Sequence, residues 1–193
     1  AHPEAAPSLL VVYASMMGST GDQAQILARE MRQQGFRTRL ARVEELPDPA
    51  EFDAVMLGSA IRGAKWLDPM LDWARNHRAA LADRPHALFQ CSMTCAGLQL
   101  SHPDGVLSPA DLARLEPDLD AIRAAVPDFA AAPVQFFPGR LEFARLEPAL
   151  RLFYPVVSGS TLQGDFRKPE QLRTYARQIA ARPEFAGLAR TLG

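Results

Sequence analysis

Residues 9–20 read Leu9-Leu10-Val11-Val12-Tyr13-Ala14-Ser15-Met16-Met17-Gly18-Ser19-Thr20, and this stretch decides the fold. Its apolar first half is typical of a buried strand, and a helix is predicted from about Gly21 to Gln34, with Gly35 as its C-terminal cap. Backbone N–H groups converge where a strand leads into a helix, and the helix dipole favours an anion there. The stretch is therefore a candidate phosphate site, with an ordinary strand-to-helix turn as the alternative.

The hydroxyls of Ser15, Ser19 and Thr20 add donors to this candidate site. The loop is neither a P-loop, because no Lys follows Gly18, nor a dinucleotide fingerprint, because G-x-G-x-x-G is absent.

The composition is that of one soluble globular domain with a full core. The chain has 193 residues, of which 48% are hydrophobic and 22% charged. Its formal net charge of -1 gives no long-range attraction to nucleic acid or anionic membrane. The two cysteines, Cys91 and Cys95, are too few for a disulfide framework or a structural zinc site, and no metal site is expected.

The first eight residues, Ala1 to Ser8, are rich in Pro and Ala and lack an initial Met. We expect residues 1–8 to form a flexible N-terminal tail. We expect a cytoplasmic protein, with membrane association as one alternative and export as another if Ala1 follows a cleaved signal peptide.

Four more strands are predicted, over residues 36–43, 54–58, 86–93 and 134–141. Helices are predicted from Asp68 as N-cap, after Ser108, and over about 169–181. Strands that alternate with helices predict an α/β fold, a doubly wound five-stranded parallel sheet with helices on both faces. The arrangement suggests the flavodoxin-like strand order 2-1-3-4-5 within a single domain over residues 9–193.

An insertion of about residues 94–133 separates the fourth and fifth strands and provides material for a lid over a substrate. Ligands of such sheets bind beyond the carboxyl ends of the strands, at the switch point in strand order. The loops that matter are therefore Ser15–Thr20, Ser59–Leu67 and the loop after Met93.

The second of these loops contains Gly58, Arg62, Gly63 and Trp66. Gly58 is expected to let the backbone approach a ligand, and Gly63 to allow a turn. Trp66 could stack on a planar cofactor, or it could fold back against the next helix. Arg62 could neutralise a phosphate or a reduced flavin, or lie on the surface without a role.

Three motifs carry a resemblance: Ser15-x-x-Gly18-Ser19-Thr20, Gly58 to Arg62, and Gly164 to Leu172. Together they resemble the flavodoxin-domain family related to the flavodoxin-type protoporphyrinogen IX dehydrogenase, over about residues 9–181. The resemblance implies FMN as cofactor, with its phosphate on the first loop and its ring between the second loop and the loop after Met93. The cofactor-binding residues so implied are Ser15, Met16, Met17, Gly18, Ser19, Thr20, Ser59, Ala60, Ile61, Arg62, Gly63, Trp66 and Thr94.

Two features depart from that family. Met16 and Met17 stand where members often carry polar residues, so phosphate binding would rest on backbone and flanking hydroxyls. The third loop, residues 94–98, lacks the aromatic that electron-shuttle flavodoxins usually place there.

The resemblance implies an FMN-dependent oxidoreductase that passes electrons from a reduced small molecule to a quinone or another acceptor, with no catalytic residue assigned. The alternatives are an electron carrier with a redox partner protein, or a binding protein that has lost FMN. Residues 146–157 could contact a membrane surface, pack over the sheet or form a homodimer interface. Cys91 and Cys95 could form a redox pair, although burial is the simpler interpretation.

Overall fold

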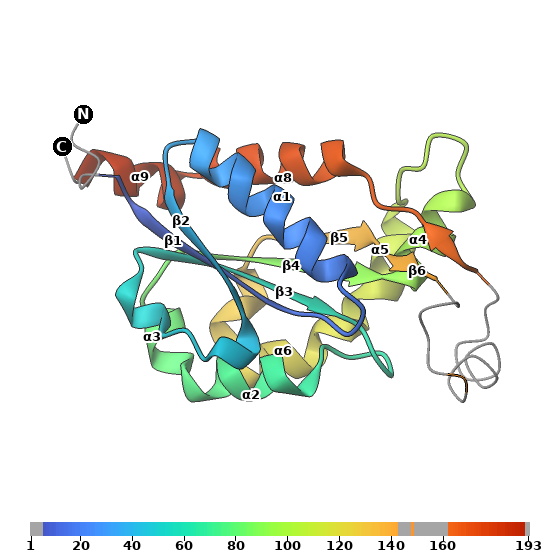
Figure 1. Ribbon diagram of the computed structural model, residues 1–193, viewed down its shortest axis with the longest axis horizontal. Helices are drawn as coiled ribbons and strands as arrows, with labels where there is room; N and C mark the ends of the chain where they lie inside the picture. Colours follow the sequence, from blue (N-terminus) through green and yellow to red (C-terminus); the bar gives the residue numbers. More distant parts are fainter. Residues whose placement is uncertain (1–5, 143–147, 149–161, 192–193) are drawn as a thin grey trace.

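A five-stranded parallel sheet forms the centre of the computed structural model, which describes residues 6–142, 148 and 162–191 (Figure 1). The strand order is β2-β1-β3-β4-β5, as the sequence predicted. The strands are β1 (Ser8–Ala14), β2 (Arg37–Arg42), β3 (Ala54–Ala60), β4 (His86–Ser92) and β5 (Val134–Pro138).

Helices cover both faces of this sheet (Figure 1). One face carries α1 (Ser19–Gln33), α8 (Pro169–Ala181) and α9 (Pro183–Thr191). The other carries α2 (Asp68–Asn76), α3 (Arg78–Ala82) and α6 (Asp120–Ala125), while α4 (Met93–Leu100) and α5 (Pro109–Leu115) lie beyond the end of β4. Short 3-10 turns span Val43–Glu45, Pro49–Glu51, Glu116–Leu119 and Pro127–Ala131. Helix α9 was not predicted from the sequence.

Alternate residues of β1 enter two separate cores. Leu9 and Val11 pack with α1 and α8, whereas Leu10 and Val12 pack with α2 and α6. All four are fully buried. Successive side chains of a strand point to opposite faces, so a strand covered on both sides must be apolar throughout. This explains why the continuous apolar run at residues 9–12 predicted a central strand.

The second half of the segment of residues 94–133 is part of the core and does not form the expected lid. Five of its apolar residues are fully buried against the sheet: Leu115, Leu119, Ile122, Val126 and Phe129. In the first half of the segment, Leu100 and Val106 are exposed. The expected loop after Met93 is also wrong, because α4 begins at Met93 directly after β4. The Ser92 hydroxyl caps this helix by accepting a 3.1 Å hydrogen bond from the Cys95 N–H.

The predicted helix ends are partly correct. Gly35 has φ 94° and follows α1, as a C-terminal cap requires. Ser108 caps α5 in a capping box with Asp111. Asp68 is not an N-cap: the cap position is Leu67, and the Asp68 carboxylate instead pairs with the Lys65 ammonium at 2.6 Å.

The predicted N-terminal tail, residues 1–8, extends too far into the chain. Ser8 is the first residue of β1, and both its N–H and its hydroxyl donate to the Asp53 carboxylate at 2.7 Å. Pro7 is buried and its carbonyl accepts from the Arg37 N–H at 2.9 Å.

The fifth strand ends earlier than predicted, at Pro138, because proline has no N–H to continue the ladder. A separate strand β6 (Arg140–Leu141) follows and pairs antiparallel with β7 (Gly164–Asp165). This pairing places residues 164–168 beside the start of α1. Apart from Pro148, the predicted contact segment 146–157 lies outside the described residues.

Within the described ranges, no helix combines the length and the apolar character that crossing a membrane requires.

Candidate functional site

The loops after β1 and β3 and the start of α4 after β4 lie side by side at one edge of the sheet. Ala14 at the end of β1 lies opposite Ser59, and Ala60 at the end of β3 lies opposite Cys91. Since parallel strands bring their carboxyl ends to one edge, the three predicted loop regions meet there. The strand order reverses between β1 and β3, so this edge contains the switch point.

The loop after β1 leaves the start of α1 without a side-chain cap. Gly18 occupies the cap position with φ 84°, a left-handed conformation that favours glycine. Its N–H donates to the Ser15 hydroxyl at 3.0 Å, and the first intrahelical bond runs from the Asp22 N–H to the Gly18 carbonyl. The N–H groups of residues 19–21 precede that bond and have no intrahelical acceptor. Amides of this kind suit an anion, which is the role that the sequence predicts for this loop.

The hydroxyl groups contribute less than expected. Ser19 and Thr20 are buried, and the Ser19 hydroxyl accepts a 3.0 Å hydrogen bond from the Arg140 N–H. Met16 is 52% exposed, so its side chain extends away from the core. An anion would therefore contact backbone amides and Ser15, with Met16 at the rim.

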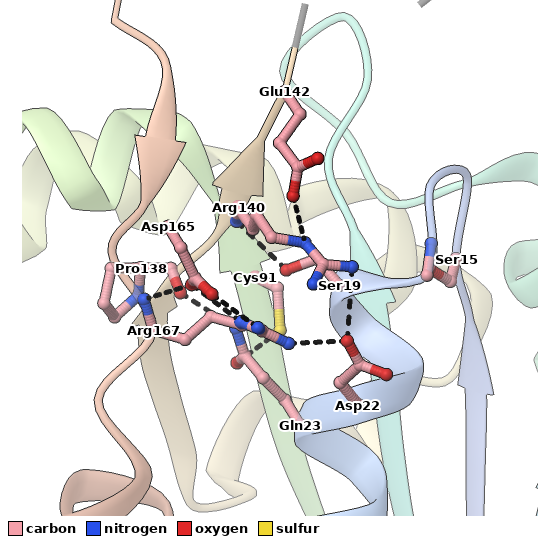
Figure 2. Close-up of polar contacts among 11 residues, drawn as sticks. Ser15, Ser19, Asp22, Gln23, Cys91, Pro138, Arg140, Glu142, Asp165 and Arg167 are labelled. Atoms are coloured by element: carbon pink, nitrogen blue, oxygen red, sulfur yellow. Dashed lines mark hydrogen bonds and ion pairs between the residues drawn. The ribbon is translucent and has the colours of Figure 1, made fainter. Parts of the chain in front are cut away.

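A buried glutamine connects this loop to the sheet (Figure 2). The Gln23 Nε2 donates to the Pro138 carbonyl at 2.8 Å, and its Oε1 accepts from the Cys91 Sγ at 3.0 Å. Helix α1 is thus joined to the ends of β4 and β5. Cys91 and Cys95 are both buried free thiols, and burial raises the pKa of both, that of Cys95 to about 12. These features favour the packing interpretation over a redox pair.

Two arginines lie across the start of α1 (Figure 2). The Asp22 carboxylate pairs with Arg167 at 2.5 Å and with Arg140 at 3.3 Å. Arg167 also binds both oxygens of Asp165, and these hydrogen bonds lower the pKa of Asp165 and raise that of Arg167. Arg140 lies within the predicted fifth strand, and Asp165 and Arg167 lie in the Gly164–Leu172 motif. The sequence did not indicate that these residues meet at the start of α1.

The second loop is a tight hairpin. Ile61 and Trp66 form an antiparallel bridge, and the Arg62 N–H donates to the Lys65 carbonyl at 3.0 Å. The two residues between them, Gly63 and Ala64, have φ of 59° and 55°, as a type I′ turn requires. The predicted turn at Gly63 is confirmed, and Arg62 and Gly63 are exposed at its tip.

Gly58 has a packing role, which differs from the ligand contact that the sequence predicted. A Cβ atom built on Gly58 would lie 2.0 Å from the Cζ atom of Phe89. The missing side chain makes room for this ring inside the core, so Gly58 does not serve a close approach to a ligand.

Trp66 is fully buried, which removes its ring from contact with a cofactor at the surface. Its Nε1 donates to the Gln90 Oε1 at 3.1 Å, and the Gln90 Nε2 donates to Asp118 at 2.8 Å. Burial raises the pKa of Asp118. The stacking expectation is therefore corrected: the ring packs with α2 in the core, as the alternative interpretation had it.

The remaining candidates are on the surface or make local contacts. Thr94 is exposed in the first turn of α4, and Ser59 uses its hydroxyl to accept from the Leu67 N–H at 3.1 Å. Outside the predicted site residues, His102 contacts the Asp111 carboxylate at 2.6 Å. Among the described residues, no three acidic, histidine or cysteine side chains form a group that could hold a metal.

Comparison with known families matches residues 10–152 to the Flavodoxin domain family. The chain belongs to the flavodoxin domain family. FMN is the cofactor that flavodoxins bind, and the uncapped amides at Gly18 and the switch-point position fit its phosphate. Comparison with curated proteins gives no match.

Solved flavodoxin-domain structures have the same fold. The flavodoxin of Streptococcus pneumonia is 16% identical, with a TM-score of 0.53 over 90% of this chain and 98% of that one. A short-chain flavodoxin associated with a bacterial microcompartment is 13% identical, with a TM-score of 0.52 over 97% of this chain and 99% of that one. The flavodiiron core from Synechocystis is 15% identical, with a TM-score of 0.51 over 97% of this chain but 37% of that one.

Proposed function

We propose that this flavodoxin-domain protein binds FMN at the carboxyl edge of its sheet and acts as an FMN-dependent oxidoreductase. The observation that carries the proposal is the start of α1. There Gly18 in a left-handed conformation leaves amides without a side-chain cap, beside the switch point of the sheet. FMN supplies the redox chemistry when bound, and the protein supplies position and electrostatics.

The residues of each loop would have separate tasks. The amides of residues 19–21 and the Ser15 hydroxyl would hold the phosphate. The ring would lie between the hairpin tip, where Arg62 and Gly63 are exposed, and the first turn of α4 at Thr94. Because Trp66 is buried, this protein would hold the ring without stacking from that tryptophan.

We further propose a reaction of the protoporphyrinogen IX dehydrogenase kind, in which electrons pass from a reduced small molecule to a quinone or another acceptor. Charge supports this over a shuttle. The formal net charge is -1, and at this edge the acids Asp22 and Asp165 are paired with Arg140 and Arg167. A shuttle that meets protein partners benefits from an uncompensated charged face.

An electron carrier with a redox partner protein is the second candidate, because flavodoxins transfer electrons to such partners and this chain belongs to their family. Both candidates require FMN. A protein that has kept the fold and lost the cofactor would bind none.

The first experiment mixes purified protein with FMN and records the visible difference spectrum. A shifted flavin spectrum is expected, and its absence at saturating FMN would contradict both candidates. The second experiment reduces the loaded protein without oxygen and adds a quinone or another acceptor. Rapid reoxidation by a quinone supports the oxidoreductase, whereas reoxidation only by an electron-transfer protein supports the carrier.

A further inference from the structure

The backbone of Arg140 is held at the start of α1. The Gly139 N–H donates to the Ser92 carbonyl at 3.1 Å, and the Phe166 N–H donates to the Gly139 carbonyl at 3.2 Å. The Arg140 N–H donates to the Ser19 hydroxyl at 3.0 Å. Hydrogen bonds to the ends of β4, β7 and α1 therefore fix the position of the Arg140 backbone.

The Arg140 side chain extends along the first turn of α1, towards Asp22 (Figure 2). Its Nη2 lies 4.0 Å from the position that a Cβ on Gly18 would take, so the guanidinium is beside the cap residue of α1. The side chain is 17% exposed. At such a partly buried place, charge interactions are screened less than at the open surface.

The two arginines at this edge differ in how firmly they are bound. Arg167 is within 2.5 Å of Asp22 and donates two hydrogen bonds to Asp165. Among the described residues, Arg140 makes only longer ion pairs, of 3.3 Å to Asp22 and 3.5 Å to Glu142. These pairs use its Nη2 and Nε, and among the described residues no acceptor engages its Nη1. Arg140 can therefore bind a new anion while Arg167 retains Asp22.

We propose that Arg140 recognises the phosphate of FMN and thereby makes the site select FMN over riboflavin, an inference that rests on the proposed function. A guanidinium presents N–H donors in a fork that matches phosphate oxygens. A phosphate monoester carries nearly two negative charges at neutral pH, whereas the riboflavin hydroxyl that replaces it carries none. The helix amides would orient the phosphate, and Arg140 would supply the compensating charge.

The test titrates the apoprotein with FMN and with riboflavin and follows quenching of flavin fluorescence. Wild type is expected to bind FMN more tightly than riboflavin, and added NaCl is expected to weaken only FMN binding. Arg140→Gln is expected to raise the Kd for FMN about tenfold or more, the range for a lost charged hydrogen bond, and to leave the Kd for riboflavin unchanged. Arg140→Lys keeps the charge but lacks the forked pair of donors. Its Kd for FMN is expected to lie between those of wild type and Arg140→Gln.

Arg173→Gln is the matched control, because it removes the same charge from α8, where Arg173 pairs with Glu170. It is expected to keep both dissociation constants. Unchanged FMN affinity in Arg140→Gln would overturn this inference and leave the proposed function standing. Equal loss of FMN and riboflavin would also overturn it, because that pattern indicates a structural role. Failure of wild type to bind either flavin would instead overturn the proposed function.

Discussion

The indole Nε1 of Trp66 donates a 3.1 Å hydrogen bond to the Gln90 Oε1, which joins the second loop to the centre of the sheet. Gln90 is fully buried in β4, and its other amide atom donates to Asp118 at 2.8 Å. The hairpin over residues 61–66 is therefore anchored from beneath, and the anchor is separate from the exposed tip that would face FMN.

Replacing Gln90 with Leu should destabilise the protein. The change leaves the Trp66 N–H without an acceptor in a dry core, which costs about 1–3 kcal/mol. Urea unfolding followed by circular dichroism measures this loss. The environment of Trp73 should be the same in this variant as in wild type. Its Nε1 donates to a different acceptor, the Pro47 carbonyl, at 2.9 Å. Stability equal to that of wild type would show that the hydrogen bond contributes nothing.

Replacing Asp118 with Asn should have the opposite effect at neutral pH. Burial raises the pKa of Asp118, so the charged carboxylate is less favourable in the folded state than in the unfolded one. Stability due to this group is present at low pH and decreases as pH rises through the folded-state pKa. Asn keeps an acceptor for Gln90 without the charge. The free energy of unfolding of Asp118→Asn, relative to that of wild type, should therefore increase with pH. A relative stability that falls from pH 4 to pH 7 would contradict this.

Adding a methyl group at Gly58 should be costly, because the new Cβ would lie 2.0 Å from the ring of Phe89. Overpacking of this kind costs about 1–3 kcal/mol or more. Gly187→Ala is the control, since no atom lies within 4 Å of its added Cβ in α9. It should stabilise the protein by up to about 1 kcal/mol through helix propensity. Thermal unfolding compares the two, and equal midpoints would refute the packing explanation.

Acid should weaken the start of α5. Hydrogen bonds from Ser108, with a further contribution from His102, lower the pKa of Asp111 to about 2. Because this folded-state pKa lies below the unfolded value of about 3.9, the contribution is complete only above about pH 5 and is lost as pH falls towards 2. Asp111→Asn should be less stable than wild type at pH 7 and should lose less stability between pH 4 and 2. Parallel stability profiles over that range would disprove the assignment.

The two cysteines should be inert in the folded protein. Both thiols are buried and have raised pKa values, about 12 for Cys95, so little thiolate is present at pH 8. A thiol reagent should label the native protein slowly and label two thiols in denaturant. Cys91→Ala and Cys95→Ala assign any residual reaction to one site. Fast labelling of native protein at both sites would revive the redox-pair interpretation.

The order of the strands and the main helices could be predicted because their signals are local. The apolar run at residues 9–12, the alternation in 36–43 and the stripe of Leu172, Tyr175, Ala176 and Ile179 each depend on neighbours within a few positions. Right-handed crossover rules then left few topologies to consider.

Some local signals were misleading because the tertiary structure assigned them other partners. Asp68 resembles an N-cap, yet it pairs with Lys65. Trp66 resembles a stacking residue in an exposed loop, but the core has room for its ring and an acceptor for its N–H. The helical spacing in residues 112–126 was correct, although it described core packing and not a lid.

By itself, the sequence determined the α/β class, the five-stranded parallel order and the place of the Ser15–Thr20 loop at the carboxyl edge of the sheet. Only the tertiary structure decided which side chains surround that loop, because Asp22 and Arg167 lie 145 positions apart and are brought together by the fold, in which β7 pairs with β6. Contacts between residues so distant leave no periodic pattern in a single sequence, whereas strand burial and helix amphipathicity repeat every few residues and do.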